Sequence, residues 1–87
     1  MAYFVYLIAS KSKKKTITYV GYTKNLKKRL YLHNTGKGAK FTKGRFWKVL
    51  YKEKHSSKKK AMIREYQVKK NARFRKLIKS LYKSKKK

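Results

Sequence analysis

YFVYLI at residues 3–8, followed by TITYVG at residues 16–21, decides the fold of this chain. Both stretches are rich in β-branched and aromatic residues, which favour strands. The first is apolar on both of its alternating faces, so we expect a strand that is covered on both sides. A polar, cationic connection at residues 10–15 separates the two stretches. The pair therefore predicts a β-hairpin with a loop of about six residues.

Three helices and a third strand are expected after the hairpin. Thr23 is the expected N-cap of a helix that ends near Asn34, and the glycine-rich and lysine-rich residues 35–45 are expected to form a loop. A strand is expected at residues 46–53, with three side chains on one face: Trp47, Val49 and Tyr51.

The last third of the chain predicts two more helices. Ser56 or Ser57 is the expected cap of a helix at residues 58–70, and Asn71 that of a final helix with an apolar stripe. The order ββαβαα predicts an α+β domain at residues 1–82, with a small, largely antiparallel three-stranded sheet flanked by helices. Residues 83–87 are expected to form a basic tail.

The charge of the chain indicates a polyanionic partner. Lys and Arg number 29 against two acidic residues, which gives a formal net charge of +27. A compact chain of this charge repels itself, and nucleic acid is the first candidate partner because neutralised phosphates release counterions. An anionic membrane surface is the second. The apolar residues of the chain are too scattered to form a surface-seeking helix. No apolar run of the chain approaches the roughly 20 residues of a membrane-spanning helix.

Cysteine is absent, which excludes disulfides and thiolate-bound zinc. Because no secretory signal is recognisable either, we expect a cytoplasmic protein. Its expected partner is DNA, with RNA as an alternative. No membrane partner and no small-molecule substrate are expected.

Glu65 is the sharpest single candidate for a functional residue. On a helical wheel it lies between Ala61 and Met62, inside the apolar stripe that faces the sheet. A carboxylate in that position needs a partner, because burying a bare charge is costly. An Arg or Lys would make it a structural ion pair, and a divalent metal would make it a ligand. Residue type and spacing leave both open.

Four further residues each have an ordinary explanation when taken alone. Tyr6 and Tyr19 are common strand residues, and Arg29 could be a solvated helix residue. His33 could simply favour the C-terminal end of its helix as a cation. Gly21 at a strand end suggests a bulge or a close approach of the backbone to another group, or it could simply end the strand.

Taken in order, these positions resemble the GIY-YIG nuclease family. FVY at 4–6 and YVG at 19–21 resemble its two half-motifs, and NLKKRLYLHN at 25–34 resembles its first helix, with an arginine four residues before a histidine. TGKGAKFT at 35–42 resembles the loop of its small stand-alone bacterial members, which are similar to the nuclease module of the excision-repair incision subunit. AMIRE at 61–65 resembles the helix with the metal-binding glutamate. Phe4 and Val20 depart from the name-giving glycine and isoleucine.

The resemblance implies a DNA endonuclease that uses a single divalent ion, Mg²⁺ or Mn²⁺, with a role in repair or recombination. Tyr6 would be the general base or would position the attacking water, and Tyr19 would bind near the same water. Arg29 would hold the scissile phosphate, Glu65 the metal, and His33 would orient the phosphate or a tyrosine. The alternative is a catalytically inactive basic module that binds DNA or RNA.

The loop at residues 36–45 is a second candidate surface. Glycines let backbone amides approach a phosphate, and four cations add charge: Lys37, Lys40, Lys43 and Arg45. The loop lacks the complete P-loop pattern, so it does not predict binding of a nucleoside triphosphate. A flexible, solvated loop is the alternative explanation.

Overall fold

β1 (Tyr3–Lys11) is the middle strand of an antiparallel sheet, in a computed structural model that describes residues 2–11 and 15–85. It pairs with β2 (Thr16–Thr23) on one side and with β3 (Lys48–His55) on the other. The helices are α1 (Leu26–Asn34), α2 (Lys58–Lys70) and α3 (Ala72–Lys85). The predicted order ββαβαα and the α+β class are confirmed.

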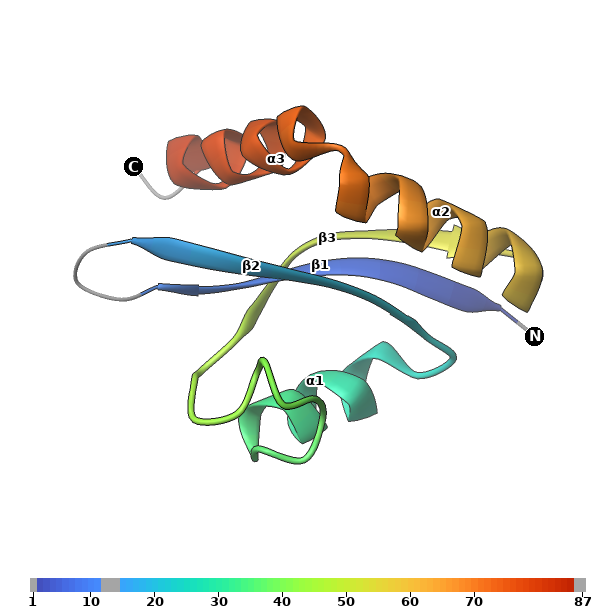
Figure 1. Cartoon of the computed structure of the whole chain (residues 1–87), viewed down its shortest axis with the longest axis horizontal. Helices are drawn as coiled ribbons and strands as arrows, with labels where there is room; N and C mark the ends of the chain where they lie inside the picture. Colours follow the sequence, from blue (N-terminus) through green and yellow to red (C-terminus); the bar gives the residue numbers. More distant parts are fainter. Residues whose placement is uncertain (1, 12–14, 86–87) are drawn as a thin grey trace.

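The helices form a layer on each face of the sheet. Figure 1 shows α2 and α3 along one face, and α1 with the loop that follows it on the other. The sequence pattern of β1 explains this arrangement, because successive side chains of a strand point to opposite faces. A strand that is apolar at every position needs cover on both sides, as predicted.

The two faces of β1 bury different clusters. Val5 and Leu7 pack with Val20 and with residues of α2 and α3: Ala61, Val68 and Ile78. Tyr6 and Ile8 pack on the opposite face with Trp47, beside Leu26 and Leu30 of α1. Fully burying each aliphatic side chain contributes roughly 1.5–3 kcal/mol. The first cluster is wholly apolar, whereas the second contains a buried phenol.

Thr23 does not cap α1, contrary to the prediction. It is the last residue of β2, where it pairs with Phe4, and its hydroxyl accepts a hydrogen bond from the Asn25 N–H at 3.2 Å. Asn25 is the true N-cap: its backbone is extended and its side chain accepts from the Lys28 N–H at 3.1 Å. The helix therefore begins at Leu26, because β2 pairing holds the backbone of Thr23 extended.

The predicted common face of Trp47, Val49 and Tyr51 is also wrong. Val49 packs with Trp47, whereas Tyr51 packs in the cluster beneath α2 and α3. A register shift opposite Leu7 and Ile8 explains the difference. An extra residue in β3 at this bulge reverses the alternation of its side chains.

Two element ends differ from the prediction. β3 begins at Lys48 rather than 46, because the Trp47 N–H donates to Oδ1 of Asn34 instead of to the sheet. α3 continues to Lys85 and so overlaps the basic tail expected at residues 83–87. The domain boundary at residue 82 stays a prediction.

The tip of the predicted hairpin loop, residues 12–14, lies outside the described residues. No helix in the described part of the chain has the length and apolarity needed to cross a membrane.

Candidate active site

The Tyr6 phenol lies against the backbone of β2, where Gly21 is its strand partner. A Cβ atom at position 21 would lie only 2.6 Å from Cζ of Tyr6, so a larger residue would displace the ring. The close approach predicted for Gly21 is confirmed. Glycine at this position lets a buried tyrosine of the central strand reach the edge strand.

A hydrogen-bonded chain leads from the Tyr6 hydroxyl through His33 to Thr42. The Tyr6 hydroxyl lies 2.9 Å from Nε2 of His33, and Nδ1 of His33 lies 2.9 Å from the Thr42 hydroxyl. All three side chains are almost fully buried. The Thr42 hydroxyl also accepts from the Ala39 N–H at 3.2 Å and donates to the Ala39 carbonyl at 3.0 Å.

We infer the direction of each proton from these contacts. Because the Thr42 hydroxyl donates its single proton to the Ala39 carbonyl, we assign Nδ1 of His33 as the donor to Thr42. In a neutral imidazole the other nitrogen, Nε2, then carries no proton and accepts one from the Tyr6 hydroxyl. His33 is thus placed to take a proton from Tyr6.

The electrostatics keep both groups neutral in the free protein. Burial lowers the pKa of His33 below its ordinary value of 6.5, and the positive charge of Arg29 lowers it further. His33 is therefore not the cationic helix end considered from the sequence. Burial raises the pKa of Tyr6, while Arg29 acts in the opposite direction by hydrogen bonding and by its charge.

Arg29 reaches this centre from α1 with an unused donor. Its Nε is buried and lacks a hydrogen-bond partner among the described residues. An unpaired buried donor is costly, and an incoming anion would satisfy it. Guanidinium groups bind phosphate through paired donors, so the predicted phosphate-binding role is compatible with this position.

Tyr19 completes the centre from β2. Its ring meets the His33 ring edge-on, with 5.2 Å between the centroids. The structure therefore places Tyr6, Tyr19 and His33 in one cluster, with Arg29 beside them.

Glu65 lies on α2, where its side chain is half-buried, as its place on the helical wheel predicted, and only loosely paired. Its side chain is 20% exposed, and its ion pair with Lys69, one turn further along the helix, spans 3.8 Å. The charge of Glu65 reaches Tyr6, where it raises the pKa of the phenol. The salt bridge considered from the sequence exists, but it is a long one with a half-exposed lysine and leaves the carboxylate accessible.

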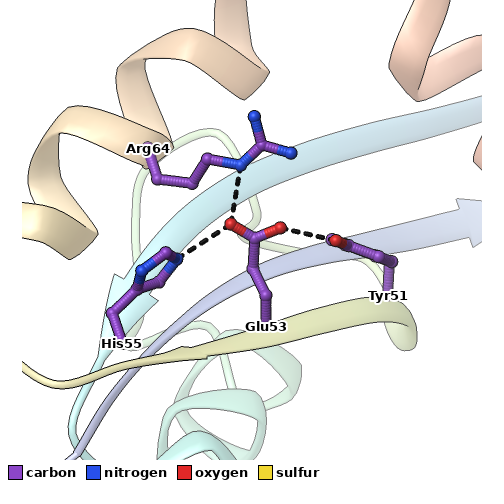
Figure 2. A network of polar contacts seen from close by, with 4 residues as sticks. All are labelled: Tyr51, Glu53, His55 and Arg64. Carbon is purple, nitrogen blue, oxygen red and sulfur yellow. Dashed lines mark hydrogen bonds and ion pairs between the residues drawn. The ribbon is translucent and has the colours of Figure 1, made fainter.

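Both carboxylate oxygens of the other acidic residue, Glu53, accept hydrogen bonds from other side chains. Figure 2 shows its carboxylate on β3, bound by Arg64 of α2 and by its strand neighbours Tyr51 and His55. The donor–acceptor distances are 2.6 Å to Arg64, 2.5 Å to Tyr51 and 2.8 Å to His55. Burial alone would raise the pKa of Glu53, but these hydrogen bonds outweigh burial and lower it. Glu53 is a structural anchor for α2.

The difference between the two acids decides where a metal could bind. The described residues contain no group of three or more potential metal ligands among His, Cys, Asp and Glu. Mg²⁺ often takes one or two protein carboxylates and completes its octahedron with water and substrate phosphate. Glu65 fits this role, because its carboxylate has a single, distant ion-pair partner among the described residues, whereas the oxygens of Glu53 are occupied.

The loop between α1 and β3 carries the second set of predicted residues. All four cations are exposed there: Lys37, Lys40, Lys43 and Arg45. Figure 1 shows the loop beside α1, on the same face of the sheet as Tyr6. Their role in binding nucleic acid stays a prediction.

Sequence reasoning missed the residues that hold His33 in place. Thr42 is buried, and a Cβ at Gly38 would lie 2.9 Å from two carbons of the His33 ring. The Trp47 indole N–H donates to the Thr42 carbonyl at 2.9 Å, which anchors the end of this segment. Gly38 and Thr42 both lie in the TGKGAKFT stretch, but spacing alone does not show which loop residues turn inward.

Comparison with known proteins agrees with this geometry. A family model for the GIY-YIG catalytic domain matches residues 2–84. The chain therefore belongs to the GIY-YIG family, a nuclease superfamily whose members act on nucleic acid and generally depend on a divalent metal.

Its relatives are small proteins of similar length. The chain is 45% identical over 76 residues to UPF0213 protein OB0043 of Oceanobacillus iheyensis, covering 86% of this chain and 85% of that protein. It is 46% identical over 76 residues to UPF0213 protein SH2523 of Staphylococcus haemolyticus, covering 86% and 89%. The solution NMR structure of UPF0213 protein BH0048 from Bacillus halodurans aligns with a TM-score of 0.53 at 35% identity, covering 93% of this chain and 85% of that one.

Proposed function

We propose that this protein is a metal-dependent endonuclease that hydrolyses phosphodiester bonds of DNA in the cytoplasm, in repair or recombination. The observation that carries the proposal is the hydrogen-bond chain from Tyr6 through His33 to Thr42, with Arg29 beside it and the charge of Glu65 acting on the Tyr6 phenol. A module that only binds phosphates needs no buried acceptor behind a phenol. It also needs no accessible carboxylate among its cations.

The hydrogen-bond chain allows Tyr6 to act without a free phenolate. The Tyr6 proton is directed at Nε2 of His33, so a water beside the phenol oxygen can only donate to it. As that water attacks phosphorus, its proton passes to the Tyr6 oxygen while the Tyr6 proton passes to His33. His33 is the terminal base, and Thr42 fixes its tautomer.

The remaining residues bind the substrate and stabilise charge. Arg29 binds a non-bridging oxygen of the phosphate through its unused donor, and Tyr19 closes the other side of the His33 ring. Glu65 would hold Mg²⁺ or Mn²⁺, which when bound would stabilise the negative charge on the leaving oxygen.

A cleavage panel with the Glu65→Gln variant tests this function. Purified protein is incubated with single-stranded, duplex, flapped and branched DNA and with RNA, in Mg²⁺, Mn²⁺ or EDTA. We expect metal-dependent cleavage by the wild type and none by Glu65→Gln, which keeps the shape of the side chain but loses its charge. DNA affinity should stay equal or rise, since one negative charge is removed.

Two results would contradict the proposal. Equal cleavage by both proteins would place the activity outside this site. Tight binding by the wild type without cleavage in any metal would leave the inactive nucleic-acid-binding module as the function.

A further inference from the structure

Phe41 is an exposed aromatic ring held in a fixed position beside the candidate active site. It is 56% exposed, yet it stacks on Tyr19 with 6.0 Å between centroids and 21° between ring planes. The indole of Trp47 supports it from a second direction at 6.3 Å. Because Tyr19 also contacts His33, the ring of Phe41 extends the aromatic cluster of the site outward to solvent.

The backbone beside Phe41 prevents the ring from retreating into the protein. The next residue, Thr42, is fully buried and bound to His33 and to both backbone groups of Ala39. Trp47, also fully buried, holds the Thr42 carbonyl. The hydrogen-bonded segment around Thr42 therefore presents a large apolar ring to water, which is unfavourable without a ligand.

The surroundings of the ring indicate what it binds. Three exposed cations lie within four residues of Phe41 in the sequence of the same loop: Lys40, Lys43 and Arg45. Cations bind phosphates, and an aromatic face binds a base, whose π-face is available only when the base is unpaired or unstacked. A loop that carries both cations and aromatic rings is typical of a surface that binds single-stranded nucleic acid.

We propose that Phe41 is a stacking platform for an unpaired nucleobase of the strand bound at the active site. The assignment rests on the proposed function for the position of the scissile phosphate, whereas the stacking itself requires no cleavage. The substrate class is therefore a strand with at least one accessible base next to the cut: single-stranded, flapped, or locally unpaired by damage. Tyr19 couples this base to the site, because it touches both Phe41 and His33.

Binding of base-bearing and abasic strands separates stacking from charge. Fluorescence anisotropy in EDTA compares labelled single strands of about 12 nucleotides with strands of the same backbone that lack bases, as DNA and as RNA. The wild type should bind the base-bearing strand more tightly. Phe41→Leu, which keeps an apolar side chain but no ring, should lose that preference, a weakening of about 5- to 150-fold for the base-bearing strand alone.

Two further variants serve as controls. Phe41→Tyr keeps a flat ring and should keep the preference. Phe46→Leu removes a ring of the same loop that is 67% exposed and should leave the preference unchanged. Thermal unfolding of each variant shows whether the fold is retained.

The proposal is overturned if the wild type binds base-bearing and abasic strands equally. It is also overturned if Phe41→Leu weakens both strands by the same factor, or if Phe46→Leu has the same effect as Phe41→Leu. Because no metal is present, these outcomes are independent of the Glu65→Gln cleavage test. A difference between the DNA and RNA arms would show which strand the platform prefers.

Discussion

Replacing Glu53 with glutamine removes a charge that holds α2 on the sheet. The carboxylate accepts hydrogen bonds from Arg64, Tyr51 and His55, and its side chain is only 18% exposed. Hydrogen bonds to charged groups contribute about 1.5–3 kcal/mol each, and glutamine keeps the shape and one acceptor oxygen. Because the Arg64 side chain is 33% exposed and water compensates part of the loss, we expect a destabilisation of about 2 kcal/mol. For a domain of this size that lowers Tm by about 8–16 °C.

The same substitution at Glu65 is the matched comparison. Each change removes one negative charge from a chain of net charge +27, so overall charge repulsion rises equally. Glu65 has an ion pair of 3.8 Å with Lys69, whose side chain is 50% exposed. Such i, i+4 pairs contribute about 0.3–0.5 kcal/mol, so Tm should change by no more than about 4 °C.

Thermal unfolding followed by circular dichroism at neutral pH measures both effects, and the cleavage assay is run on the same samples below the lower Tm. We expect Glu53→Gln to lose stability and keep cleavage, and Glu65→Gln to keep stability and lose cleavage. If Glu65→Gln were as destabilised as Glu53→Gln, Glu65 would be a structural ion pair and the metal assignment would be refuted.

Two further predictions concern His33. Gly38→Ala should abolish cleavage and destabilise the fold by about 1–3 kcal/mol, because the added methyl group would overlap a ring held on both sides. Gly44→Ala meets no neighbouring atom but strains a left-handed backbone with a φ of 80°, so it should also lose stability and yet retain cleavage. Cleavage rates across pH should stay high somewhat below pH 6.5, because burial and Arg29 lower the pKa of His33 and the proton-accepting neutral form persists there. A rate that already falls above pH 6.5 would show that His33 is not the terminal base.

The sequence was sufficient for the features that follow from periodicity. The apolar pattern of residues 3–8 predicted a strand covered on both sides, and the helical wheel predicted that the side chain of Glu65 is partly buried. Glycine between strand-forming residues predicted the close approach at Gly21. Each of these depends on local geometry that repeats along the chain.

Features that depend on contacts between distant residues could not be predicted in this way. The bulge in β3 arises where two strands adjust to each other, and it moved Tyr51 to the opposite face. Thr42 looked like any polar loop residue, although its hydroxyl sets the tautomer of His33. The structural role of Glu53 could not be predicted from the sequence, because its partner Arg64 lies on a helix that follows later in the chain.

The alternation along β1 ties the integrity of the fold to its chemistry. Val5 and Leu7 fill the core beneath α2 and α3, while Tyr6, between them in the sequence, faces α1. A register shift of β1 by one residue would exchange these two faces. An aliphatic side chain would then occupy the position of the Tyr6 phenol, and the phenol hydroxyl would lie in the apolar core. Copies with the shifted register would be less stable and would lack the Tyr6 phenol at the candidate site, so no long-lived population of folded protein in the wrong register should accumulate.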